Sequence, residues 1–166
     1  MTGHHHLAEL NVARLRAPLD GPELAGFVAQ LDKINALADA APGFVWRLRD
    51  SDGDNATALR PYDDGMVIVN MSVWESLDAL WDYVYRTVHL DLMRHRREWF
   101  HRMADHHLVL WWLPAGELPT LAEGIDRLER LRKDGPGRYA FTFRQPVPPP
   151  DGAVVDGAPA VGRAPG

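Results

Sequence analysis

A histidine and an arginine beside an apolar helical stripe give this chain its strongest chemical signal. Between residues 75 and 103, apolar side chains recur every three or four positions, as on one face of an α-helix. His89 and Arg96 lie at the edge of that face. An imidazole can accept a proton near neutral pH or bind haem iron, and a guanidinium can hold a carboxylate or a developing oxyanion. His89 and Arg96 are therefore candidate catalytic residues, although hydrogen bonds to neighbouring groups would also explain both.

The same helix predicts a ridge of side chains along one side of a cavity. Its members lie three or four residues apart and are stacked along the helix: Tyr85, His89, Leu92, Arg96, Trp99 and Met103. Tyr85 and Trp99 are candidate substrate-binding residues of this ridge. Aromatic residues in such a stripe are also typical of a protein core.

Two strand-borne amides are the next candidates. Asn11 and Asn70 interrupt apolar strands, where an unpaired amide is costly, so each must find a partner or bind a ligand. Because alternate residues of a strand share a face, Asn70, Ser72 and Trp74 lie together. We expect Asn11, Asn70 and Trp74 to contact the substrate. A structural hydrogen bond to an adjacent loop is the other explanation for Asn70.

The elements that position these residues follow from periodicity and from glycine and proline breakers. Strands are predicted at 7–15, 44–49, 66–74, 108–113 and 139–143, and helices at 22–41, 75–103 and 120–134. Thr120 and Glu123 predict a capping box at the start of the last helix. This order of elements predicts an α+β fold in which helices pack on one face of an antiparallel sheet.

Two of the predicted strands, 66–74 and 108–113, are apolar on both faces. Helices on one face would leave the other face in water, with Trp111 or Trp112 in a large apolar patch. We therefore expect a homodimer whose two sheets pack face to face, with a cavity between each sheet and its long helix.

A resemblance to a known family covers nearly all of residues 7–143. It lies in the segments LAELNVARLRAPL, PGFVWRLR, VNMSVWESLDALWDYVYRTVHLDLMRHRREWF, LVLWWLPAGELPTLAEGIDRLERLRKDGP and YAFTF. These segments resemble the bacterial family called domain of unknown function 3291. The resemblance implies a ferredoxin-like fold of the dimeric α/β barrel superfamily. That superfamily includes antibiotic-biosynthesis monooxygenases, haem-binding peroxidases and oxygenases, polyketide cyclases and lactone isomerases.

The resemblance also implies a range of functions. The first is a monooxygenase-like oxidoreductase of secondary metabolism that acts on an aromatic or polyketide-like metabolite, with His89 as base or as axial ligand of a haem. The alternatives are a cofactor-free cyclase or isomerase in the same pocket, a non-catalytic small-molecule-binding dimer, and a purely structural dimer.

Composition narrows the possible binding partners and the expected cellular location of the protein. The 166 residues suit one domain at 7–145, between an N-terminus (1–6) and a Pro/Gly/Ala-rich tail (146–166) that we expect to be disordered. A net charge of -5 argues against nucleic acid or an anionic membrane as partner. The sequence has no cysteine, no histidine spacing typical of a zinc site and no nucleotide-binding motif. Without a signal peptide or membrane span, we expect a cytoplasmic protein that binds a small hydrophobic or aromatic molecule.

Overall fold

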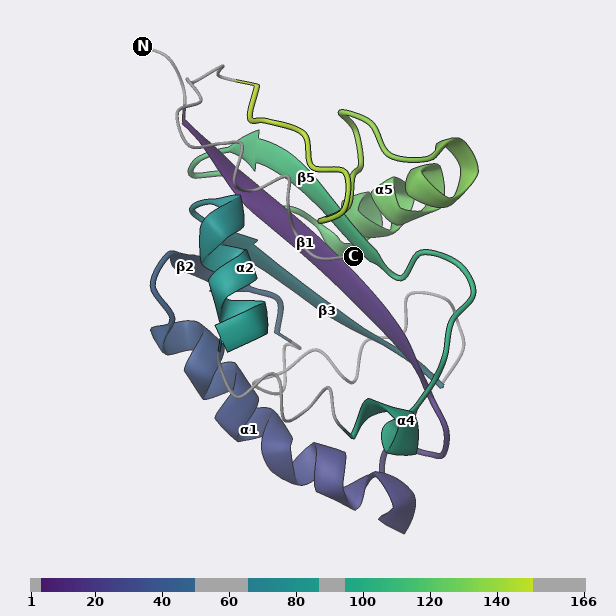
Figure 1. The fold of residues 1–166 in the computed structure, drawn as a ribbon. Helices are drawn as coiled ribbons and strands as arrows, with labels where there is room; N and C mark the ends of the chain where they lie inside the picture. The colour runs from purple at the N-terminus through teal and green to yellow at the C-terminus, as the bar shows by residue number, and fades with distance from the viewer. Residues whose placement is uncertain (1–3, 50–65, 87–94, 151–166) are drawn as a thin grey trace.

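In the part of the chain that the structure describes, residues 4–49, 66–86 and 95–150, strand β1 is the centre of a five-stranded antiparallel sheet (Figure 1). The structure is a computed structural model. The strands are β1 (His5–Leu15), β2 (Phe44–Arg47), β3 (Val67–Trp74), β4 (Phe100–His101) and β5 (Leu108–Pro114). β1 pairs with β3 on one side and with β5 and β4 on the other, and β2 pairs with β3.

The helices connect these strands as two interleaved β-α-β units. A short 3₁₀ helix, η1 (Pro22–Leu24), and α1 (Ala25–Ala40) lead from β1 to β2. Helices α2 (Leu77–Arg86) and α4 (Arg96–Trp99) lie in the connection from β3 to β5. The resulting strand order β2-β3-β1-β5 is the ferredoxin-like arrangement. The predicted α+β fold, with helices packed on one face of the sheet, is thereby confirmed for α1, α2 and α4.

A further helix, α5 (Leu121–Asp134), begins where the sequence predicts. The Thr120 hydroxyl accepts a hydrogen bond from the backbone N–H of Glu123 at 3.1 Å, which caps the helix. The Glu123 carboxylate accepts hydrogen bonds from Arg127 instead, so the second half of the predicted capping box is absent among the described contacts.

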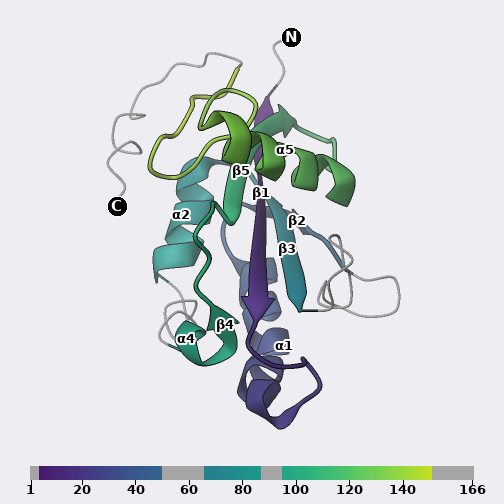
Figure 2. The same cartoon turned by 90° about the vertical axis from the view of Figure 1, so that its right-hand side faces the viewer.

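Helix α5 lies on the sheet face opposite to α1 and α2 (Figures 1 and 2). Its Leu128 and Leu131 are buried against apolar residues of β1, β3 and β5. A Cβ atom at Gly124 would lie 3.1 Å from Met71 Sδ and 3.3 Å from the Trp111 ring, so the glycine allows a close approach to the sheet.

The apolar residues that suggested a second subunit are therefore covered within one chain. Trp111 has no exposed surface, and Trp112 is partly buried, with its indole N–H donating to the carbonyl of Val147 at 2.7 Å. A second copy is therefore not needed to cover this face, because α5 packs there, which the sequence pattern did not indicate.

The helix predicted for residues 75–103 does not extend to its predicted end. Phe100 has extended backbone angles, and β4 pairs with Arg14 and Leu15 of β1. The Phe100 ring packs edge-on against Phe27 of α1, while Met103 packs with the apolar residues on the opposite sheet face. Trp99 and Met103 therefore do not belong to one continuous ridge. Apolar spacing alone did not reveal that the chain becomes a strand here.

The predicted strand at 139–143 is reduced to one bridge, between Leu110 and Phe141. Tyr139 instead turns to α5, where its hydroxyl bonds to Asp126 and its ring lies against Arg127.

The described termini extend beyond the predicted domain limits. At the N-terminus, β1 includes His5 and His6, while residues 1–3 lie outside the described residues. Val147 packs beyond the predicted boundary at 145, and residues 151–166 are also outside the described residues. None of the helices in the described part has the length and apolar content to span a bilayer.

Candidate functional site

Polar side chains cross the helix-covered face of the sheet between two apolar clusters. We call them the polar band: Glu9, Asn11, Arg47, Asn70 and Ser72. Directly opposed residues of paired strands share a face, and the register opposes Glu9 to Ser72, Asn11 to Asn70, and Arg47 to Ser72. One flanking cluster contains Leu7, Trp74 and Leu110, and the other contains Leu15, Phe27, Ile68 and Trp99.

A chain of hydrogen bonds leads from Trp74 to Glu9. The Trp74 indole N–H donates to Ser72 Oγ at 2.8 Å, and Ser72 Oγ lies 2.7 Å from Glu9 Oε2. An indole N–H can only donate, so Ser72 accepts from Trp74 and its own hydroxyl proton is directed to Glu9. The bonds thus fix the orientation of the Glu9 carboxyl.

Burial makes Glu9 a weak acid. The residue is 4% exposed, and burial raises its pKa from 4.5 to about 8, while the hydrogen bonds from Ser72 act in the opposite direction. Near neutral pH the carboxyl is therefore mostly protonated. It changes charge close to the pH range in which general acids and bases are effective.

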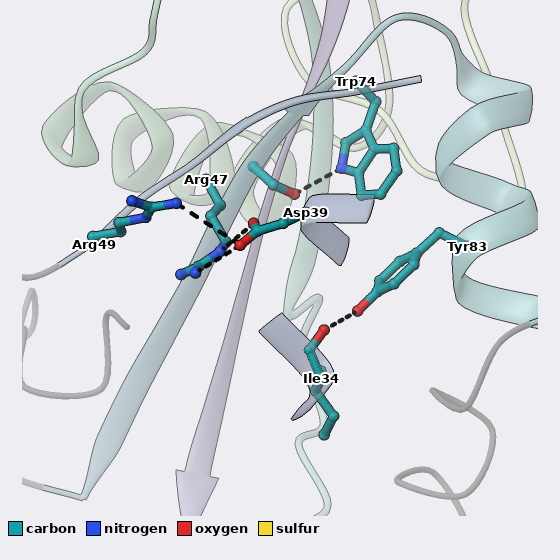
Figure 3. A network of polar contacts seen from close by, with 7 residues as sticks. Ile34, Asp39, Arg47, Arg49, Trp74 and Tyr83 are labelled. Atoms are coloured by element: carbon teal, nitrogen blue, oxygen red, sulfur yellow. Dashed lines mark hydrogen bonds and ion pairs between the residues drawn. The ribbon is translucent and has the colours of Figure 1, made fainter. Parts of the chain in front are cut away.

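The neighbouring guanidinium of Arg47 does not neutralise Glu9, because it is paired with Asp39 at the end of α1. Arg47 Nε and Nη2 donate to the Asp39 carboxylate at 2.8 and 3.2 Å, and Arg49 lies 3.9 Å from the same carboxylate (Figure 3). The hydrogen bonds from Arg47 lower the pKa of Asp39. Among the residues that the structure describes, no cation acts on the pKa of Glu9, so its burial is not compensated there.

Tyr83 of α2 closes the buried end of the site. Its ring packs on Trp74 with a centroid separation of 5.1 Å, and its hydroxyl donates to the carbonyl of Ile34 at 3.2 Å (Figure 3). Burial raises the pKa of Tyr83 to about 12, and the nearby Glu9 also acts to raise it. Tyr83 thus stays neutral and joins α1 to α2 above the sheet.

Three amides near this site differ in accessibility and in pairing. Asn70 is exposed although β3 is an inner strand, and Asn11 opposite it is partly buried. Asn35, on the buried side of α1, is 8% exposed, and its Nδ2 has no hydrogen-bond partner among the described residues. An unpaired buried donor costs about 1–3 kcal/mol, so a ligand acceptor there would be favourable.

A cleft of about 470 Å³ opens between the turn after α1 and helix α2. It is lined by Ala41, Pro42, Gly43, Glu75, Ala79, Asp82 and Tyr83. Tyr83 is shared between this cleft and the buried polar groups around Trp74. The cleft is thus at the rim of the site, not between the sheet and the ridge where the sequence predicted a cavity.

The structure brings together only some of the predicted site residues. Asn70 and Trp74 share one face of β3, as predicted, and Asn11 of β1 lies on the same face of the sheet. Arg96 is exposed on the short helix α4, and Tyr85 packs against Trp81 and Phe143 at the outer side of α2.

The two remaining predicted residues are Trp99 and His89. Trp99 is a core residue, 5% exposed and packed on Phe27. His89 lies outside the described residues.

Sequence reasoning missed Glu9, Arg47 and Tyr83. Glu9 had one usable signal, because it is a lone acid two residues before Asn11 and therefore on the same strand face. Arg47 gave no such signal, since a charged residue near the end of a short strand is usually solvated. Tyr83 was hidden because it lies just beside the predicted stripe of α2 and not within it.

The chemistry that these groups support is proton transfer and hydrogen bonding. The polar band offers a carboxyl, a hydroxyl, two amides and the guanidinium of Arg47, with an indole at its edge. Among the described residues, no three or more histidine, aspartate or glutamate side chains are grouped so as to hold a metal ion.

The family described as "Domain of unknown function (DUF3291)" matches residues 6–157. No curated protein gives a significant match.

Solved structures similar to this chain include SnoaB, a cofactor-independent oxygenase from Streptomyces nogalater. It is 20% identical over 70% of this chain and 96% of its own, with a TM-score of 0.43. PA3566 from Pseudomonas aeruginosa is 12% identical over 72% of this chain and 99% of its own, with a TM-score of 0.45. A Nitrosomonas europaea protein described as a "Putative antibiotic biosynthesis monooxygenase" is 12% identical over 71% of this chain and 94% of its own, with a TM-score of 0.43. At such identities the likeness concerns the fold alone.

Proposed function

The chain belongs to the DUF3291 family, and from that premise we propose that it is a monooxygenase-like oxidoreductase acting in the cytoplasm on an aromatic or polyketide-like metabolite. The bound molecule lies on the helix-covered face of the sheet, against the polar band. This proposal extends beyond family membership, which carries no activity of its own.

The observation that supports the proposal best is an accessible amide beside a buried acid on an otherwise apolar sheet face. Asn70 is exposed, Asn11 opposes it, and Glu9 is the next residue of β1 on that face. Apolar surroundings suit an aromatic ring, and a few polar groups suffice to orient it. The Trp74 indole, bonded to Ser72, is buried beside these groups and is packed by Phe44 and Tyr83.

The donors in the polar band do not fit haem. Haem iron takes imidazole, thiolate, thioether or phenolate as axial ligand, whereas the band offers carboxyl, amide and hydroxyl groups. His89, the haem ligand that the sequence suggested, is outside the described residues. The proposed chemistry therefore uses no haem.

The other residues predicted from the sequence also have proposed roles in binding or catalysis. Asn70 and Asn11 hydrogen-bond a carbonyl or phenolic oxygen of the substrate. His89 acts as a base, and Arg96 holds an anionic group at the outer end of the site. Tyr85 and Trp99 contribute only to the apolar surroundings.

Oxygen consumption with a panel of hydroxylated aromatic compounds tests the proposal. Wild-type protein is expected to consume oxygen and form an oxidised product, and Asn70→Ala to lose at least about tenfold in kcat/KM, since it removes an oriented hydrogen bond. Gln145→Ala removes an exposed amide outside the site and is the matched control, with an expected kcat/KM equal to that of wild type.

Two results would contradict the proposal. Binding of the panel without oxygen consumption would indicate a carrier, and rearranged products without oxygen uptake would indicate a cyclase or isomerase. A Soret band in the purified protein that disappears in His89→Ala would restore the haem-dependent alternative.

We also propose that two copies associate as a homodimer. Among the described residues, β2 is the outermost strand next to β3, and Val45 on it is 36% exposed. An unpaired strand edge is a ready site for pairing with a second chain. Native mass spectrometry is expected to show a dimer that Val45→Pro weakens, and a single-chain mass at micromolar concentration would contradict it.

A further inference from the structure

Glu9 is the buried acid of the polar band, and the function proposed above assigns no chemical step to it. It lies on the same face of β1 as Asn11, two residues away, which corresponds to about 6.6 Å along a strand. That distance is comparable to the width of an aromatic ring with its substituents. A molecule held by one oxygen at Asn11 and Asn70 would therefore place a second polar group at Glu9.

The carboxyl is also held in one orientation. Glu9 Oε2 accepts the Ser72 hydroxyl at 2.7 Å, and Ser72 is in turn fixed by the Trp74 indole at 2.8 Å. Since Oε2 already accepts a proton from Ser72, the other oxygen, Oε1, is better placed to carry the proton of the neutral acid. Ser72 and Trp74 are buried, so this geometry is rigid.

We propose that Glu9 exchanges a proton with a phenol or enol hydroxyl of the bound molecule, and that Ser72 and Trp74 position its carboxyl. This inference rests on the function proposed above and names its substrate class. In the step, the ionised form of the Glu9 carboxyl is the acceptor: the ligand O–H bond breaks, its electron pair stays on the ligand oxygen, and the proton forms an O–H bond with Glu9 Oε1. One proton moves, and no electrons are transferred between the groups.

The charged groups around Glu9 favour a complex in which Glu9 and the ligand oxygen share one proton. Arg47 on β2 is paired with Asp39 of α1, and Tyr83 on α2 is neutral, so no cation from these elements compensates a second negative charge. An ionised Glu9 next to a phenolate would repel it in a site of low dielectric. Because the pKa of Glu9 is raised to about 8, the effect of Glu9 ionisation on phenolate binding falls within an accessible pH range.

Binding of 4-nitrophenolate as a function of pH tests the inference without requiring turnover. The probe is ionised from about pH 8 upward, so only the protein changes protonation between about pH 8 and pH 10. Wild-type protein must take up a proton on Glu9 to bind it, and its affinity is expected to fall about tenfold per pH unit above about pH 8. In Glu9→Gln, whose side chain is nearly isosteric and cannot ionise, the affinity is expected to be independent of pH.

Two further variants test whether Ser72 acts by positioning the Glu9 carboxyl and not only by supporting the fold. Ser72→Ala removes hydrogen bonding that lowers the pKa of Glu9, so the affinity loss is expected to begin at higher pH. Glu117→Gln, which changes an exposed acid just after β5, is expected to behave like wild type. Circular dichroism confirms that each variant is folded before it is titrated.

The outcomes distinguish the inference from the function on which it rests. Probe binding with the same pH dependence in wild type and Glu9→Gln would overturn the role of Glu9 and leave the proposed function standing. Failure of both proteins to bind 4-nitrophenolate or any compound of the aromatic panel would overturn the proposed function, and this inference with it. A pH-linked loss of affinity in wild type alone supports the inference.

Discussion

At the scale of single residues, Glu9 links the stability of the protein to pH. The folded state keeps its proton up to about pH 8, whereas the unfolded chain loses it near pH 4.5. Unfolding therefore releases a proton between these values, and rising pH favours the unfolded state. The free energy of unfolding is expected to fall by about 1.4 kcal/mol per pH unit in this window, relative to Glu9→Gln.

Urea unfolding of both proteins between about pH 5 and pH 8 measures this difference. Groups other than Glu9 titrate equally in the two proteins, so they cancel in the comparison. A constant difference across the window would show that Glu9 is ionised in the folded state at neutral pH.

The opposite dependence is expected for Asp39. The pKa of Asp39 is lowered in the folded state, chiefly by the hydrogen bonds from Arg47. Asp39 therefore stabilises the folded state fully above its ordinary pKa, and this stabilisation is lost as the pH falls through the lowered pKa. Asp39→Asn leaves the buried guanidinium of Arg47 without its carboxylate partner. We expect a loss of about 2 kcal/mol at neutral pH, after discounting the partial exposure of Asp39.

Asp134→Asn is the matched control for Asp39→Asn. Asp134 pairs with Arg130 at 3.6 Å on the surface of α5, with both side chains more than half exposed. Such a pair contributes about 0.5 kcal/mol or less. Equal losses from the two substitutions in urea unfolding would contradict a buried role for Arg47.

At the scale of elements, the contact between α5 and the sheet depends on Gly124. A valine there would place its Cβ 3.1 Å from Met71 Sδ, and its two methyl groups closer still to Leu10 or Trp111. We expect Gly124→Val to lower the free energy of unfolding by about 1–3 kcal/mol. Ala122→Val adds bulk on the exposed side of α5 and is expected to cost about 0.6 kcal/mol, as measured by thermal unfolding.

The turn from α1 to β2 depends on another glycine. Gly43 has φ of +82°, and a Cβ there would lie 2.5 Å from the Cβ of Ala79 on α2. Gly43→Ala is expected to cost at least about 2 kcal/mol, from backbone strain and from the clash together. Gly116→Ala has a comparable φ of +95° but no atom within 4 Å, so it reports the strain alone in the same measurement.

Sequence patterns predicted the elements whose boundaries depend on local chemistry. Thr120 marks the start of α5, and β3 ends at Trp74, as expected. The end of the long helix was missed because Trp99 and Met103 continue its apolar spacing, although they pack on different faces of the sheet. Such a difference depends on contacts between distant elements, which periodicity does not contain.

The same reason explains what was missed in the candidate site. Asn11 and Asn70 attracted attention because an amide in an apolar strand is unusual. Glu9 is in the same strand as Asn11, but its importance depends on burial beneath helices and on Arg47 being paired elsewhere. Neither condition is visible in the order of residues.

At the scale of the whole molecule, α5 occupies the face where the sequence predicted a second subunit. Leu128→Asp would place a charge against the buried residues of β1, β3 and β5, and so detach this helix. We expect a loss of more than about 3 kcal/mol in urea unfolding, together with self-association by native mass spectrometry. Ala122→Asp, on the exposed side of α5, is expected to change neither.

The central position of β1 has a consequence for how the chain finds its strand register. Shifting β1 by one residue would turn Glu9 toward the apolar surface beneath α5 and bring Leu10 among the amides, so the misaligned molecule would bury the acid without its hydrogen bond from Ser72. A group well suited to handling protons thereby also rejects misfolded pairings. Replacing Glu9 would therefore make the register of β1 less specific and would also remove the proposed proton exchange.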